Sequence, residues 1–210
     1  MSGPLIAVLD YGMGNLRSVE KALERVGARA DLTSDHERVR AADGIVLPGV
    51  GAFRKAMEAV RARGLDDLLR ERVDAGVPAL GLCLGMQLLF ESSTEIGGAT
   101  GIGLLPGEVR ALDAPGLKVP QIGWNPVAWR GDSPLTDGLP PLTPMYHVHS
   151  FSAHPERAED VLGTAHYGTE FVSAVSRGSV FGCQFHPEKS GEHGLHLLGN
   201  FTALCAPVPA

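Results

Sequence analysis

The first half of the sequence alternates short apolar runs with amphipathic patterns of helical period, and this alternation limits the fold more than any other feature. The apolar runs predict strands at residues 5–9, 28–32, 44–47 and 77–83. The amphipathic patterns predict helices at residues 16–26, 53–62 and 65–74, and another that starts at Leu84. Strands that alternate with helices form parallel sheets covered on both faces. We therefore predict an α/β fold built on an open, largely parallel sheet.

The first predicted helix carries signals at both ends. Asn15 belongs to the residue types whose side chains cap helix N-termini, and Gly27 follows the last apolar position of the helical pattern. We therefore expect Asn15 to cap this helix and Gly27 to stop it.

The second half has a different texture, with short strands separated by turns. Strands are predicted at residues 108–112, 127–129, 145–151, 161–167, 171–176 and 180–185, and a closing helix at 195–204. Hairpins among these strands are expected to extend the sheet and make it mixed. The Pro-, Gly- and Asp-rich stretch 131–144 predicts a surface loop and is the best candidate for a domain boundary. Because neither side has enough core segments to fold alone, we predict one domain over residues 1–210.

Composition excludes several classes of protein. With 44% hydrophobic and 20% charged residues, the chain can form a core and a solvated surface, so it is not disordered or fibrous. A net charge of −6 with scattered basic residues argues against nucleic acid or membrane partners. The sequence shows no leader and no long apolar run, which favours a cytoplasmic protein. Three widely spaced cysteines predict neither disulfides nor a metal site.

The sharpest local signal is the stretch Gly81-Leu82-Cys83-Leu84-Gly85, where a buried strand meets a helix. A nucleophile between two glycines at such a junction is typical of a nucleophile elbow, in which larger flanking residues would collide with neighbouring backbone. The start of the following helix favours a thiolate, and the Leu84 N–H can face a developing oxyanion. The alternative is that Cys83 is a small core residue, because free cysteines are often buried.

A second signal follows the last predicted strand, in the sequence Gln184-Phe185-His186-Pro187-Glu188. Proline disfavours the helical region for the residue before it, so His186 and Glu188 can point to one side. A thiolate nucleophile needs a base, and the base needs a partner that holds its tautomer. Taken singly, His186 could be a surface histidine and Glu188 a solvated carboxylate. Because ligands bind at the carboxyl ends of strands in open α/β sheets, we predict that both lie beside Cys83.

The segment Pro48-Gly49-Val50-Gly51 also follows a predicted strand. Its glycines would allow a peptide to turn an N–H toward the oxyanion position. Taken alone, it is equally consistent with an ordinary turn before the helix that begins at Phe53.

These residues together resemble the class I, or triad, glutamine amidotransferase family. The resemblance rests on the stretch Gly-Leu-Cys-Leu-Gly-Met-Gln at residues 81–87 and on His-Pro-Glu at 186–188. Within that family the chain is most similar to the glutaminase subunits of imidazole glycerol phosphate synthases. The narrower matches lie at residues 10–15, 48–53, 122–125, 146–150 and 184–190. The resemblance implies a flavodoxin-like class I amidotransferase fold over essentially the whole chain.

The resemblance implies a role for each matching residue. Cys83 would attack the side-chain amide of glutamine to give a thioester, His186 would transfer the proton and Glu188 would orient it. The backbone N–H groups of Leu84, Val50 and Gly51 would stabilise the oxyanion. The residues expected to bind glutamine are Gly49, Gly51, Gln87, Ser150 and Phe151. Neither a cofactor nor a metal is implied.

The resemblance also implies a partner. Ammonia would pass to a (β/α)8 cyclase subunit in a heterodimer, which would form imidazole glycerol phosphate and an aminoimidazole carboxamide ribonucleotide in histidine biosynthesis. The residues expected to face this subunit are Asn15, Trp124, Tyr146 and Lys189. Two alternatives remain open from the residues: a glutaminase that serves another synthase or acts alone, and a binding subunit that has lost its chemistry.

Overall fold

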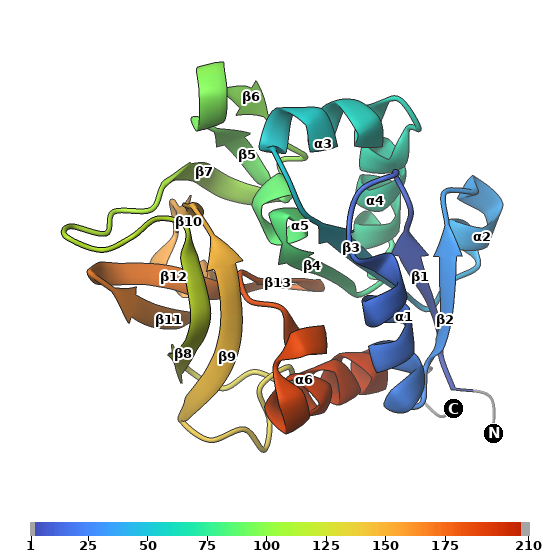
Figure 1. Ribbon diagram of the computed structural model, residues 1–210. Coiled ribbons are helices and arrows are strands. Elements are labelled where there is room, and N and C mark those ends of the chain that lie inside the picture. Colours follow the sequence, from blue (N-terminus) through green and yellow to red (C-terminus); the bar gives the residue numbers. More distant parts are fainter. Residues whose placement is uncertain (1–2, 207–210) are drawn as a thin grey trace.

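The computed structural model describes residues 3–206, and its centre is a branched mixed sheet (Figure 1). The parallel part has the order β2-β1-β3-β4. Its strands are β1 (Leu5–Leu9), β2 (Arg29–Thr33), β3 (Gly44–Gly49) and β4 (Ala79–Cys83). The helices that connect or follow them are α1 (Leu16–Arg25), α2 (His36–Arg40), α3 (Phe53–Arg61), α4 (Leu65–Asp74) and α5 (Leu84–Leu88). The predicted alternation of strands and helices is confirmed.

The rest of the chain adds strands that pair mostly antiparallel and a closing helix, α6 (Gly191–Leu204). These strands are β5 (Phe90–Ser93), β6 (Ala99–Thr100), β7 (Leu105–Ala111), β8 (Gln121–Trp129), β9 (Leu142–His149), β10 (Phe151–Pro155), β11 (Val161–Tyr167), β12 (Thr169–Arg177) and β13 (Val180–Cys183). The last strand, β13, lies between β4, to which it is parallel, and β12, to which it is antiparallel. The sheet then continues through β10, β7, β5 and β6, while β11, β8 and β9 branch from β12. Within residues 3–206, all thirteen strands therefore belong to one hydrogen-bonded sheet.

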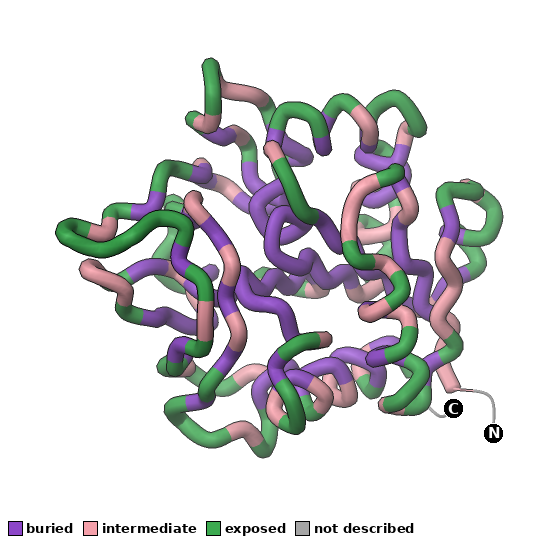
Figure 2. The backbone as a smooth tube through the Cα atoms, viewed as in Figure 1, coloured by how far each residue is buried: buried purple, intermediate pink, exposed green. Residues whose placement is uncertain are grey.

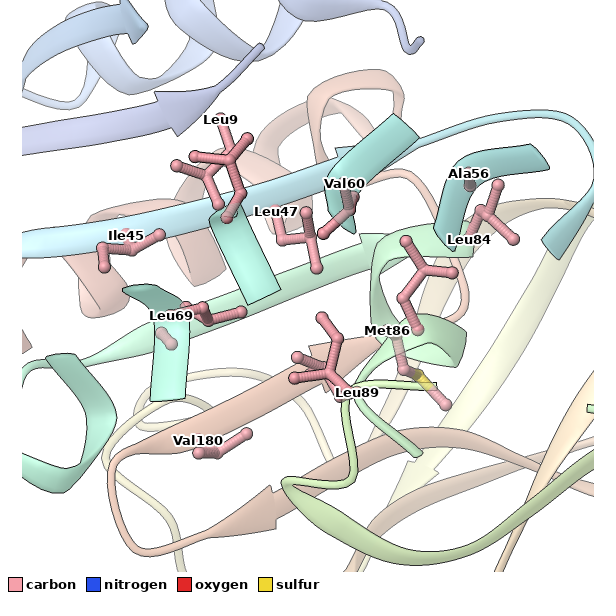
Figure 3. Packing of buried hydrophobic residues seen from close by; sticks show 14 of the residues in the cluster. Leu9, Ile45, Leu47, Ala56, Val60, Leu69, Leu84, Met86, Leu89 and Val180 are labelled. Atoms are coloured by element: carbon pink, nitrogen blue, oxygen red, sulfur yellow. The ribbon is translucent and has the colours of Figure 1, made fainter. Parts of the chain in front are cut away.

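Nearly all residues of the central strands β1, β3 and β4 are buried, as expected of a sheet covered by two helical layers (Figure 2). In β1, Ala7 and Leu9 point into one apolar cluster, whereas Ile6 and Val8 point into the other. The first cluster includes residues of α3, α4 and α5, and Figure 3 shows part of it around Met86. The second cluster includes residues of α1 and α6. The period-2 alternation therefore places one helical layer on each face of the sheet.

Several short elements, among them α2, β5 and β6, were not predicted because such short segments carry little periodicity. The helix α2 has one buried residue, Val39, and it begins where the Asp35 carboxylate accepts a hydrogen bond from the Arg38 backbone N–H at 3.0 Å. The strand predicted at residues 145–151 is two strands, since β9 pairs with β8 and β10 pairs with β7 and β12. Ser150 lies between them.

The prediction that the Asn15 side chain caps the first helix is wrong. α1 does begin after Asn15, but the Asn15 side chain makes no capping hydrogen bond. Its backbone carbonyl instead accepts from the Val19 N–H at 3.4 Å. The amide of Asn15 therefore has no capping role in this helix.

The stretch at residues 131–144 is more than a surface loop, and this corrects the prediction. Leu135 is fully buried in the cluster beside α6, and its carbonyl accepts a hydrogen bond from Asn200 at 3.0 Å. Residues 142–144 already belong to β9. The stretch therefore packs on α6, and strands on either side of it share one sheet. Among residues 3–206, no helix is long and apolar enough to cross a membrane.

Candidate active site

The junction of β4 and α5 forms a sharp bend at Cys83. Its backbone has φ +53° and ψ −111°, a strained combination for a residue with a side chain. A Cβ on Gly81 would lie 2.7 Å from the backbone of Met86, and a Cβ on Gly85 would lie 1.7 Å from the Leu47 carbonyl oxygen. Both flanking positions therefore require glycine, as the elbow interpretation predicts.

The imidazole of His186 is held by the carboxylate two residues further along. His186 follows β13 in an extended conformation, with φ −104° and ψ 93°, and the short 3-10 helix η3 (Pro187–Lys189) comes next. The His186 Nδ1 lies 2.8 Å from Glu188 Oε1, and the Glu188 side chain is only 1% exposed. The predicted geometry of this pair is therefore confirmed.

Two strands bring the thiol and the imidazole together. β13 is the parallel neighbour of β4, with Cys183 beside Leu82, so the residues that follow each strand meet at the same edge of the sheet. Burial acts to lower the pKa of His186, but the neighbouring Cys83 thiol and Glu188 carboxylate outweigh burial and raise this pKa to about 9. An imidazole in this setting is suited to exchange a proton with the Cys83 sulfur.

A cavity of about 380 Å³ opens above the Cys83 sulfur. It is lined by Val50, Gly51, Cys83, Leu84, Gln87, Glu95, Pro120, Val148, His149, Ser150, Phe151, His186 and Lys189. Most predicted site residues are therefore gathered around one space of the size that small-molecule sites have. The chemistry available there is nucleophilic attack by a thiol with an oriented base.

A sequence profile described as "Glutamine amidotransferase class-I" matches residues 7–204 of the chain. The chain belongs to the class I glutamine amidotransferase family. The match spans the elbow, the His186–Glu188 pair and nearly all of the sheet.

Relatives of this amidotransferase match nearly all of its length. It is 50% identical over 199 residues to a Moorella thermoacetica protein named "Imidazole glycerol phosphate synthase subunit HisH". The matched residues cover 95% of this chain and 94% of that protein. A protein of the same name from Bacillus cereus strain G9842 is 51% identical over 198 residues, or 94% of this chain and 93% of that protein.

Solved structures confirm the fold of the amidotransferase. One described as "Crystal structure of glutamine amidotransferase" superimposes with a TM-score of 0.75 at 23% identity, over 95% of this chain and 98% of that chain. PurLQS from Thermotoga maritima gives a TM-score of 0.75 at 23% identity, over 95% and 97% of the two chains.

Two predicted site residues of the amidotransferase lie behind the cavity rather than in its wall. Gly49 is buried at the end of β3 beside Cys83, and a Cβ there would lie 2.5 Å from the Tyr11 hydroxyl. Glu188 faces a much smaller space that Asn15 and Gly49 also line. Gly49 therefore provides close packing beneath the cavity, and Glu188 supports His186 from behind.

The residues expected to face a partner are on the surface of the amidotransferase. Trp124 is 58% exposed and packs edge-on against Tyr146, with ring centroids 6.0 Å apart. Asn15 and Lys189 are also exposed, and Lys189 lies at the cavity rim. The structure therefore brings Lys189 to the cavity, while the aromatic pair lies on the β8–β9 hairpin.

Sequence reasoning missed three residues around the cavity. Glu95 lines it and accepts a hydrogen bond from the Phe53 N–H at 2.7 Å, and His149 lines it from the end of β9. Gln184 is fully buried, with its Nε2 3.8 Å from the Cys83 sulfur. Glu95 lies in an irregular segment with no motif, so no sequence signal identified it, whereas Gln184 stands two residues before the predicted base.

A larger hollow of about 810 Å³ lies elsewhere, between the 131–141 stretch and α6. It is lined by none of the predicted site residues, and the geometry of the triad favours the smaller cavity as the active site. Within residues 3–206, no three His, Cys, Asp or Glu side chains are grouped as a metal site requires.

Two buried histidines make the stability of the fold sensitive to acid. Burial lowers the pKa of His147 to about 3 and that of His149 to about 4. Because the usual value is about 6.5, the unfolded chain binds protons below that pH which the native chain does not. The contribution of these two histidines to the free energy of unfolding should therefore be retained above pH 6.5 and fall by about 2 kcal/mol per histidine by pH 5. The raised pKa of His186 acts in the opposite direction and offsets part of this fall with a gain between pH 7.5 and 6.5. Urea unfolding at pH 7.5 and 5.0 measures this.

The variant His147→Gln is the control for this acid sensitivity. The fall in its free energy of unfolding between the two pH values should be smaller by about 2 kcal/mol, because one of the two buried imidazoles is gone. An unchanged difference would assign the sensitivity to other groups.

Proposed function

We propose that this chain is the glutaminase subunit of an imidazole glycerol phosphate synthase, acting in histidine biosynthesis as one domain over residues 1–210. It hydrolyses L-glutamine and supplies ammonia to a cyclase subunit. The observation that carries this proposal is that the strained Cys83 elbow and His186 line one cavity, with Glu188 holding His186 from behind. Identity of about 50% to proteins named as subunits of this synthase supports the choice of acceptor.

The chemistry follows from the triad. His186 takes the proton of the Cys83 thiol, and the sulfur attacks the side-chain amide carbon of glutamine. As the tetrahedral intermediate collapses, the C–N bond breaks and His186 returns the proton to the leaving nitrogen, which departs as ammonia. Water then attacks the thioester with His186 as base, and glutamate leaves as the C–S bond breaks. Glu188 holds the imidazole through both steps.

The cavity wall supplies the rest of the site. We assign the oxyanion role to the N–H of Leu84 at the start of α5 and to the Val50 and Gly51 peptides, which line the same cavity. The glutamine-binding role belongs to Gln87 and to the backbone of Ser150 and Phe151, which line the same cavity. No cofactor takes part.

We add Glu95 to the residues that bind glutamine. Within the described residues, it is the one acidic side chain in the cavity lining, so it is suited to pair with the α-ammonium group of the substrate. Glu95→Gln keeps an acceptor for the Phe53 N–H but removes the charge. We expect KM for glutamine to rise about tenfold while kcat changes little, as measured by steady-state glutamate release.

Glu91→Gln is the matched control for this prediction. The Glu91 carboxylate also accepts a backbone N–H, that of Gly107 at 3.0 Å, but it lies outside the cavity. Its KM should equal that of the parent chain. A raised kcat or an unchanged KM in Glu95→Gln would contradict the assignment.

The partner is the cyclase subunit, and we place it against the exposed residues Asn15, Trp124 and Lys189 and the half-buried Tyr146. An exposed Trp is typical of the residues that contribute most to protein interfaces. Trp124→Ala should weaken binding of the cyclase subunit about thirtyfold in Kd by titration calorimetry, which corresponds to about 2 kcal/mol.

Leu142→Ala is the control for the interface, because Leu142 is also 58% exposed but begins β9, far along the hairpin from Tyr146. Its Kd should stay within about twofold of the parent value. Equal losses in both variants would show that the effect is not specific to the aromatic pair.

Glutamate release with and without the cyclase subunit tests the proposed function. The mixture of this chain, the cyclase subunit, its phosphorylated substrate and glutamine should release glutamate much faster than this chain alone. Equal rates would contradict the proposal. Competition between acceptor synthases in a pull-down decides whether ammonia goes to a different partner.

A further inference from the structure

A buried glutamine lies directly beneath the reacting sulfur. Gln184 is fully buried, and its Nε2 is 3.8 Å from Cys83 Sγ, within hydrogen-bond distance for sulfur. The Gln184 backbone N–H donates to the Ser173 carbonyl at 2.9 Å, which fixes the residue at the end of β13. The mechanism above gives this side chain no role, although a buried amide beside a nucleophile is placed to act on it.

The hydrogen bonds of three neighbouring groups fix which end of this amide faces the sulfur. The Phe151 carbonyl can only accept, so Gln87 turns its Nε2 toward it, at 3.1 Å. The same Gln87 Nε2 lies 3.0 Å from the Gln184 Oε1 and donates its other hydrogen there. Gln184 must then point its own NH2 group at Cys83 Sγ. The Phe151 carbonyl therefore fixes the orientation of the Gln87 amide, and the Gln87 amide fixes that of the Gln184 amide.

We propose that Gln184 is a further catalytic residue, whose side-chain amide donates a hydrogen bond to the Cys83 sulfur and stabilises it as a thiolate. The thiol form has a different partner, because the Cys83 sulfur also lies 3.7 Å from the Val148 carbonyl, which can accept from S–H but not donate to a thiolate. Deprotonation thus removes one hydrogen bond and strengthens the other. Hydrogen bonds to charged groups are about twice as strong as neutral ones, so the amide favours the charged sulfur.

The amide also connects the nucleophile to the substrate site. Both hydrogens of the Gln87 Nε2 are used by Phe151 and Gln184, so Gln87 has its oxygen left for the cavity that it lines. Rotation of the Gln87 amide would face its oxygen toward two acceptors. The same network therefore fixes the substrate contact and the donor to the sulfur.

This inference rests on the proposed nucleophilic role of Cys83, and the experiment separates the two. The rate of Cys83 alkylation by iodoacetamide is measured against pH in the full chain, with the labelled peptide identified by mass spectrometry. Neither glutamine nor the partner is needed. If Cys83 of the parent chain is not labelled at any pH, the proposed function fails; if it is labelled, the variants test Gln184.

Two variants remove the donor in different ways. Gln184→Glu keeps an acceptor for Gln87 but presents a carboxylate to the sulfur, and Gln184→Met fills the space without a polar group. The midpoint of the alkylation profile should rise by about one pH unit in Gln184→Met and by more in Gln184→Glu, and labelling below the midpoint should slow about tenfold. A purely structural side chain would leave the midpoint in place. A Gln184→Met profile that superimposes on that of the parent chain would overturn the proposal.

Gln121→Met is the matched control, because Gln121 is also a buried glutamine but hydrogen-bonds to His149 rather than to the sulfur. Its alkylation midpoint should match that of the parent chain. If the Gln184 variants do not fold, NMR spectroscopy of the parent chain tests the proposal instead. The side-chain amide signal of Gln184 in ¹H–¹⁵N spectra should titrate with the alkylation midpoint, and a pH-independent signal would overturn the proposal.

Discussion

Cys83→Ala is expected to reduce glutamate release by the complex with the cyclase subunit by about four to six orders of magnitude. Removing the nucleophile leaves only binding and oxyanion contacts, and in cooperating triads one deletion costs nearly as much as removing the whole set. Coupled detection of glutamate in the complex measures the loss. Adding His186→Ala to Cys83→Ala should therefore lower the rate little further.

Cys183→Ala is the matched control for this loss. Cys183 is completely buried, and burial raises the pKa of its thiol well above the usual range, so this second cysteine is a poor nucleophile. Its variant should keep the parent rate. A comparable loss in Cys183→Ala, or substantial activity in Cys83→Ala, would remove the elbow from the mechanism.

Gly85→Ala is expected to destabilise the fold by about 4 kcal/mol or more, although alanine is the better helix former. A Cβ at this position would lie 1.7 Å from the Leu47 carbonyl oxygen and 2.7 Å from its carbon. Since both atoms belong to the backbone of β3, relief requires the strand or α5 to move. The melting temperature should fall by about 10 °C or more.

Gly199→Ala in α6 is the control for this prediction. The nearest atom to its added Cβ is the Val26 Cβ at 3.9 Å, which is an ordinary contact. Alanine should therefore stabilise this helix by about 0.5–1 kcal/mol. A small effect of Gly85→Ala would mean that the junction of β4 and α5 is less tightly packed than its distances indicate.

The parts of the site that follow from sequence are those with local causes. The need for glycine at position 81 arises from the backbone of Met86, five residues along, and Pro187 favours the conformation that lets His186 meet Glu188. The clash that requires glycine at position 85 involves Leu47 of β3, but the spacing of the two glycines around Cys83 was visible in the sequence. The alternation of strands and helices likewise predicted the parallel half of the sheet. Local rules were enough because each element there has a clear period or a clear stop.

The remaining parts depend on contacts between distant segments. Glu95 reaches the cavity because its carboxylate binds the N–H of Phe53, 42 residues away, and no local pattern encodes that contact. Leu135 resembles an exposed loop residue among prolines and glycines until α6 covers it. The prediction for Asn15 was wrong although the local pattern was favourable. Asparagine stands at the position before α1 where caps occur, but its side chain makes no hydrogen bond to the helix.

The position of β13 has a consequence for the order in which the molecule can be made. It is the last strand along the chain, yet it lies between β4 and β12 near the middle of the sheet (Figure 1). A growing chain on the ribosome that lacks it leaves β4 and β12 with open edges and does not yet contain His186, the base of the triad. An unfinished polypeptide therefore cannot consume the cell's glutamine.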